Sequence, residues 1–124
     1  MRIGVHRGDI YYACFVVLNP DETPVDIDFD TVYFTVKKCP KTKVVIFQKS
    51  LAEGTIVKVE PGTYQLKIEP EDTSTMSFGK YAFDIQFEYK NGLSDVIKET
   101  FRGDFDVLEE VTYPENERGV ENGV

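Results

Sequence analysis

The chain has 124 residues, a formal net charge of −8 and 41% hydrophobic residues. This length fits one domain, because two domains of half the size would each bury too little apolar surface for a secure core. The apolar fraction argues against a wholly disordered chain, and no apolar run approaches the roughly 20 residues that span a bilayer. The acidic balance argues against nucleic acid as a partner, because phosphate contacts need a dense Lys/Arg face.

Few side chains in this sequence are suited to catalysis or metal binding. There is a single histidine, His6, with two cysteines and no tryptophan. A catalytic triad or a histidine-rich metal site needs more of these groups. No apolar h-region follows the first residues, so we expect no signal peptide and predict that Cys14 and Cys39 are free thiols, Cys14 as a small core residue. We therefore expect a protein that is not an enzyme and has no catalytic, cofactor-binding or metal site.

Short segments rich in β-branched and aromatic residues are separated by turn sequences, a pattern typical of an all-β sandwich or barrel. The first strand is expected at 9–18; because it is apolar on both alternations, it should be covered on both faces or paired centrally. Residues 31–37 alternate cleanly and predict a half-buried strand. Two further strands are expected at 44–48 and 55–59.

The second half of the chain continues this pattern, with one exception. After the turn at 60–62, Tyr64, Leu66 and Ile68 form the inward face of the next strand. Residues 70–76 lack strand character and predict a single helical turn with acids at its start. Residues 79–89 then carry five large apolar or aromatic side chains on one alternation, which predicts the central strand of the core.

Asn91-Gly92 predicts a tight hairpin, since this pair readily adopts the positive φ values that such turns require. The return strand begins near Ser94, and Gly103 within it predicts a bulge or bend. Residues 109–124 hold five glutamates and one arginine, so half of the net charge lies there. We predict a β-sandwich domain over 1–108, with seven or eight strands, and an acidic, disordered C-terminal tail over 109–124.

Two groups of residues are candidates for an interaction surface. Tyr11 and Tyr33 are expected to point outward, where tyrosine covers a sandwich face, stacks on a ligand or joins an interface. The only basic cluster is expected in a loop that is solvated by default and that could steer an acidic partner, including a neighbour's C-terminal tail. Its members are Lys37, Lys38, Lys41 and Lys43.

Several short motifs follow one another in a defined order. They are Thr23-Pro24-Val25-Asp26-Ile27, the strand 31–37, Pro70-Glu71-Asp72-Thr73, the segment 79–86 and the segment 101–107. In this order and spacing they resemble the small immunoglobulin-like β-sandwich modules of tailed phages and prophages, similar to the N-terminal domain of phage baseplate upper proteins. The resemblance covers roughly residues 7–108. It departs at Asp28-Phe29-Asp30, where those modules usually have Thr-Gly-Ala.

The resemblance implies a two-sheet immunoglobulin-like β-sandwich of seven or eight antiparallel strands, with the short helical turn near 70–76. It brings no catalytic residues. It implies a virion structural protein of a phage or prophage, either a tail or baseplate component or an accessory protein, acting through protein–protein contacts. The expected partners are other phage structural proteins or a second copy of the chain, without nucleic acid or membrane, first in the host cytoplasm and then in the virion. The alternative is a carbohydrate- or receptor-binding β-sandwich module.

Overall fold

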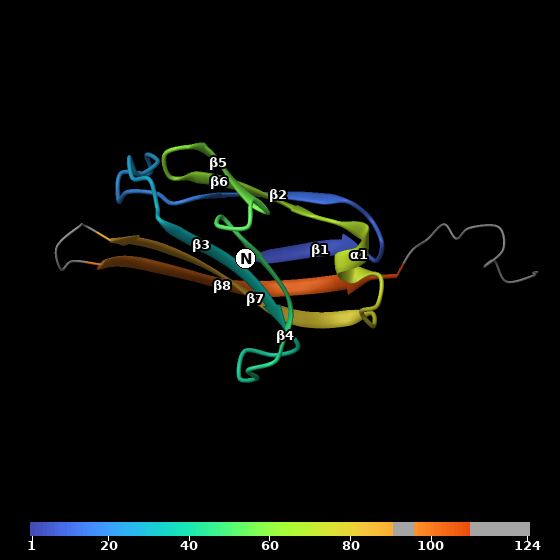
Figure 1. Cartoon of the computed structure of the whole chain (residues 1–124). Coiled ribbons are helices and arrows are strands. Elements are labelled where there is room, and N and C mark those ends of the chain that lie inside the picture. Colours follow the sequence, from blue (N-terminus) through green and yellow to red (C-terminus); the bar gives the residue numbers. More distant parts are fainter. Residues whose placement is uncertain (91–95, 110–124) are drawn as a thin grey trace, which may run out of the picture.

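The computed structural model describes residues 1–90 and 96–109, which form two packed β-sheets (Figure 1). One sheet has five strands in the order β1-β8-β7-β3-β4, and the other has three in the order β2-β6-β5. The predicted all-β sandwich is therefore confirmed. Its elements are β1 (Arg2–His6), β2 (Tyr11–Val16), β3 (Thr31–Lys37), β4 (Val45–Ser50), β5 (Ile56–Glu60), β6 (Thr63–Ile68), α1 (Pro70–Thr73), β7 (Gly79–Lys90) and β8 (Val96–Leu108).

Strand β7 lies at the centre of the larger sheet, as its sequence pattern predicts. It pairs with β8 from Gly79 opposite Val107 to Lys90 opposite Val96, and with β3 on its other side. Strand β3 matches its predicted range, and its inward residues Val32, Phe34 and Val36 are fully buried. Burial of each such side chain contributes about 1.5–3 kcal/mol, so these central strands supply much of the stability of the fold.

An aromatic cluster joins the two sheets. Phe34 of β3 lies with its ring centroid 6.0 Å from Phe15 of β2 and 5.1 Å from Phe83 of β7. Antibody domains place a tryptophan and an inter-sheet disulfide on the equivalent strands. Two residues before Phe83, the Tyr81 hydroxyl donates a hydrogen bond of 2.7 Å to the Ser77 carbonyl, as in the tyrosine corner of those domains. The aromatic contacts join the three-stranded sheet to the five-stranded sheet and fix the two layers of the sandwich.

The first strand, β1, differs from the sequence prediction. The sequence places no strand before residue 9 and predicts antiparallel pairing, whereas Arg2–His6 pairs in parallel with β8, from Arg2 opposite Asp104 to His6 opposite Leu108. Ile3 and Val5 of this strand are buried. Five residues give only a weak alternation, and the strand that stabilises them lies about a hundred residues further along the chain.

Gly103 does not mark a bulge, so that part of the prediction is wrong. The β7–β8 register runs without a shift through Gly103, which lies opposite Phe83. A Cβ atom at Gly103 would lie 2.5 Å from the Met1 carbonyl oxygen and 2.6 Å from the Phe83 ring. The glycine is required because the N-terminal residue and an aromatic ring both approach the backbone of β8 closely.

Strand β2 is covered on only one face, contrary to the sequence prediction. Ala13 and Phe15 face the core, whereas Tyr12, Cys14 and Val16 are exposed on the outer face of the three-stranded sheet. The prediction that Cys14 is a core residue is therefore wrong, because no further layer covers this face among the described residues. Both cysteines are free thiols, as predicted.

The predicted helical turn is present as α1, and it is tied to β4. The Asp72 carboxylate accepts the Glu69 N–H through Oδ2 at 2.7 Å, and the same oxygen lies 2.5 Å from the Lys49 Nζ. Among the described residues no helix is long and apolar enough to cross a membrane. The predicted Asn91-Gly92 turn, and the predicted tail beyond Glu109, lie outside the described residues.

Candidate functional site

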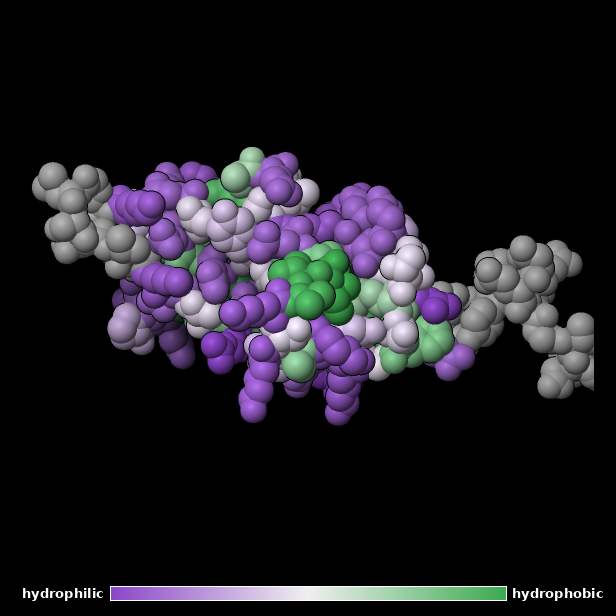
Figure 2. Space-filling view, turned by 60° about the horizontal axis from the view of Figure 1, so that its bottom comes forward, coloured by the Kyte–Doolittle hydropathy of each residue, from purple (hydrophilic) through white to green (hydrophobic). Residues whose placement is uncertain are grey.

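Strand β4 forms one edge of the five-stranded sheet and carries an exposed apolar segment. Val44, Val45 and Ile46 are 71%, 45% and 38% exposed, and we call these three residues the apolar edge. Figure 2, which turns the side that carries β4 toward the viewer, shows a compact hydrophobic patch surrounded by hydrophilic side chains. A cluster of large apolar side chains in this position is characteristic of a protein–protein contact.

A β-bulge explains why these side chains face solvent. The β3–β4 register changes between Val36 opposite Phe47 and Lys37 opposite Val45, which leaves Ile46 as the extra residue. Beyond the bulge, Phe47 turns inward and packs against Phe34 with their ring centroids 6.3 Å apart. The bulge therefore ends the inward-facing part of β4 and leaves the residues before it outside the core.

The side of β4 that faces away from β3 is covered at Ser50 and open at Gln48. At the far end, the Ser50 N–H donates to Thr55 Oγ1 at 2.7 Å, and the Thr55 N–H donates to the Ser50 carbonyl at 3.1 Å. Thr55 thus covers the open side of the sheet at Ser50. In an antiparallel strand every second residue points its backbone groups to the same side, so Gln48 presents its N–H and C=O to the open side.

The loop between β3 and β4 adds positive charge beside the apolar edge. Lys38, Lys41 and Lys43 are exposed and Lys37 is half-buried, and we call residues 37–43 the basic loop. The Lys38 Nζ lies 4.6 Å from the centroid of the Tyr81 ring, which holds this side chain against the end of β7. All four predicted lysines thus lie in the segment directly before the apolar edge.

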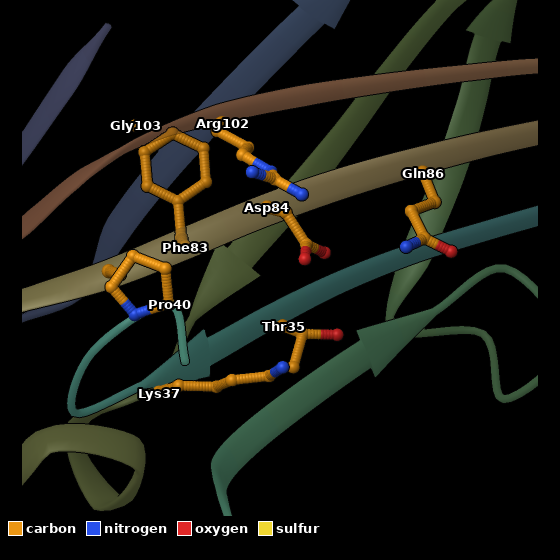
Figure 3. A pocket seen from close by; sticks show the side chains of 9 residues that line it. Thr35, Lys37, Pro40, Phe83, Asp84, Gln86, Arg102 and Gly103 are labelled. Atoms are coloured by element: carbon orange, nitrogen blue, oxygen red, sulfur yellow. The ribbon is translucent and has the colours of Figure 1, made fainter. Parts of the chain in front are cut away.

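A shallow polar pocket of about 260 Å³ lies on the outer face of the same sheet. Figure 3 shows Lys37, Thr35, Asp84 and Arg102 pointing over this face from three neighbouring strands, with Pro40 of the basic loop at one end. Thr35 lies opposite Asp84 in the sheet register, and Asp84 lies opposite Arg102. The pocket thus presents two cations and one carboxylate, whereas Thr35 is only 7% exposed and its hydroxyl accepts a hydrogen bond of 3.0 Å from Gln48 Nε2.

The two tyrosines predicted to form part of an interaction surface lie on different sheets. Tyr33 is 37% exposed on the outer face of the five-stranded sheet, opposite Gln86, which lines the polar pocket. Tyr11 is half-buried on β2 and packs against the core, so its predicted outward orientation is wrong. Tyr33 shares a face with the basic loop, whereas Tyr11 does not.

Several charged groups away from this surface form ion pairs. The Asp28 carboxylate binds Lys58 Nζ at 2.9 Å, and this hydrogen bond raises the pKa of Lys58. The buried Asp106 carboxylate accepts a hydrogen bond from the Arg2 Nε, which ties β1 to β8. No three metal-ligating side chains come together among residues 1–90 and 96–109.

The apolar edge is the feature that the sequence prediction missed. Residues 44–47 read Val-Val-Ile-Phe, and a short continuous apolar run is typical of a strand buried on both faces. That pattern conceals the bulge, and it carries no information about whether another strand lies beyond β4. The lysines that immediately precede the run were the one local sign of exposure.

Searches against family models, curated proteins and solved structures found no match to this chain.

Proposed function

We propose that this protein is a non-enzymatic structural component or accessory protein of a tailed phage or prophage particle, and that it acts through protein–protein contacts. The motif order in residues 7–108 supports the phage assignment. The immunoglobulin-like sandwich is the fold which that resemblance implies. In this proposal the protein is made in the host cytoplasm and becomes part of the virion.

The apolar edge beside the basic loop is the observation that carries the protein–protein role. An exposed strand edge offers unpaired backbone groups to an incoming strand, and native proteins usually protect such edges with charge, proline or a covering element. Here Val44, Val45 and Ile46 remain exposed at 71%, 45% and 38%. The adjacent lysines favour a partner that carries negative charge next to an apolar, extended segment.

Affinity capture with the products of the neighbouring genes tests the proposal. The tagged chain should retain at least one tail or baseplate protein, and Val45→Lys with Ile46→Lys should weaken that binding at least tenfold without lowering thermal stability. The matched control is Val57→Lys with Val59→Lys, which adds the same charges to exposed valines of the other sheet. Equal binding by all three proteins, or binding of no neighbouring product, would contradict the proposal.

A glycan- or receptor-binding role is the second candidate, and the polar pocket favours it. Sugars are bound by an aromatic face together with several hydrogen-bonding groups, and Tyr33 lies opposite Gln86 at the edge of a pocket that also contains Asp84 and Arg102. A glycan array tests this role: binding that is lost in Tyr33→Ala supports it, and an array without signal counts against it.

A further inference from the structure

We infer that the apolar edge of one copy of this protein receives residues 110–113 from the C-terminal tail of a second copy, so that the chain assembles head to tail. This inference rests on the proposed function, because it names the partner of the same surface. It draws on the sequence of the tail, the charge and exposure around β4, and the distance between β8 and β4.

The tail sequence fits the surface chemically. Glu110-Val111-Thr112-Tyr113 combines β-branched and aromatic residues that favour an extended strand, and Pro114 then ends it, because proline has no N–H to donate. In an extended strand Val111 and Tyr113 point to the same side, where they can cover the apolar edge. The open backbone groups of Gln48 supply main-chain hydrogen bonds for the added strand.

The distribution of charge sets the direction of the added strand. A strand antiparallel to β4 runs from Gln48 toward Val45, so the residues after Pro114 arrive at the basic loop. Those residues include Glu115 and Glu117, which would face Lys41 and Lys43. A parallel strand would instead carry both glutamates away from the lysines. Opposite charges therefore favour the antiparallel arrangement, which is also the more stable pairing.

The dimensions of the sheet show that the tail must come from another copy. A strand added beyond β4 lies four strand spacings from β8, about 19 Å at the usual spacing. Val111 follows the end of β8 at Leu108 by three residues, which extend over about 11 Å at most. Across the sheet, Val45 pairs with Lys37, Lys37 pairs with Ala82, and Ala82 pairs with Asp104. Val45 is therefore level with Asp104 and not with Leu108, which places the apolar edge still further from the end of β8.

Such a contact joins two different surfaces, so the copy that donates its tail keeps an unused edge and the copy that receives it keeps an unused tail. Contacts of this kind repeat until they close into a ring or extend into a filament. Three of the four lysines of the basic loop are exposed, so their attraction for the glutamates should be screened by salt. We expect oligomers whose size grows with protein concentration and falls with ionic strength.

Sedimentation equilibrium of the full chain at low ionic strength tests this inference. The full chain should associate, and a chain that ends at Glu109 should remain monomeric at the same concentrations. Reversal of charge on either side, by Lys41→Glu with Lys43→Glu or by Glu115→Lys with Glu117→Lys, should weaken association about tenfold. The protein that carries all four substitutions should return to within about threefold of the original affinity, because the opposite charges face each other again.

The matched control is Lys90→Glu with Lys98→Glu, which reverses two exposed lysines at the far end of the β7–β8 pair and should leave association unchanged. A monomeric full chain, equal association by the chain that ends at Glu109, or no recovery in the four-substitution protein would each overturn the inference. Capture of neighbouring gene products by a monomeric chain would leave the proposed function intact while refuting self-assembly. Self-assembly without such capture would count against only the broader proposal.

Discussion

The ion pair between Lys49 and Asp72 should be one of the strongest single contributions to stability outside the apolar core. Only 8% of the Lys49 side chain and 16% of the Asp72 side chain is exposed, and Nζ lies 2.5 Å from Oδ2. The pair joins β4, which carries the apolar edge, to the helical turn α1. Its removal therefore affects both stability and the anchoring of the candidate surface.

The loss of unfolding free energy when Lys49 is replaced depends on the surroundings that the Asp72 carboxylate keeps. Lys49→Met keeps most of the apolar stem but leaves the Asp72 carboxylate largely buried, with the Glu69 N–H as its hydrogen-bond donor. Breaking a buried ion pair typically costs about 3–5 kcal/mol. Because Asp72 keeps this donor and some contact with water, we expect the lower end, about 3 kcal/mol, which corresponds to a fall in Tm of roughly 10 °C.

Urea unfolding of a double-mutant cycle measures this contribution. Lys49→Met, Asp72→Asn and the double variant should give a coupling energy of about 2 kcal/mol. The matched control is Lys58→Met, which removes an ion pair to Asp28 whose side chains are 41% and 67% exposed, and it should cost less than about 1 kcal/mol. The reasoning is refuted if Lys49→Met costs no more than Lys58→Met.

Three further outcomes are expected. Gly103→Ala should destabilise the fold by about 1–3 kcal/mol in urea unfolding, because the new methyl group would overlap the Phe83 ring; an unchanged midpoint would contradict the close approach. Burial raises the pKa of Tyr64 above its ordinary value of 10.0, so the folded state binds this proton more tightly than the unfolded state. Stability should therefore fall as pH rises above about 10, and the fall should be shallower in Tyr64→Phe; parallel curves would contradict this. Cys14 and Cys39 should both react with a thiol reagent in the native protein, whereas protection of one until unfolding would contradict its exposed position.

The sequence was most informative where one strand face is buried and the other is not. Residues 31–37 and 79–89 alternate strictly, and the structure places β3 and β7 at almost the same bounds. This agreement arises because alternation directly reports which side chains leave water. The helical turn at Pro70 was likewise predicted from local chemistry, although its attachment to β4 through Lys49 was not.

Only part of the candidate site could be predicted from the sequence. The lysines of the basic loop are visible in the sequence because four of them lie within residues 37–43. Tyr11 and Tyr33 look equivalent in the sequence, yet the structure places one against the core and the other on the outer face of the larger sheet. That difference depends on the orientation of β2, whose two alternations are both apolar and therefore do not reveal which side faces the core.

By itself, the sequence determined the all-β class, the strongest strands, the short helix and the concentration of negative charge in the last sixteen residues. Only the tertiary structure decided that β1 pairs with β8, that Gly103 makes room for Phe83, and that β4 is an edge. The physical reason is that alternation and turn chemistry act between neighbouring residues. Strand partners and sheet edges instead depend on contacts between residues far apart in the chain, which no local pattern records.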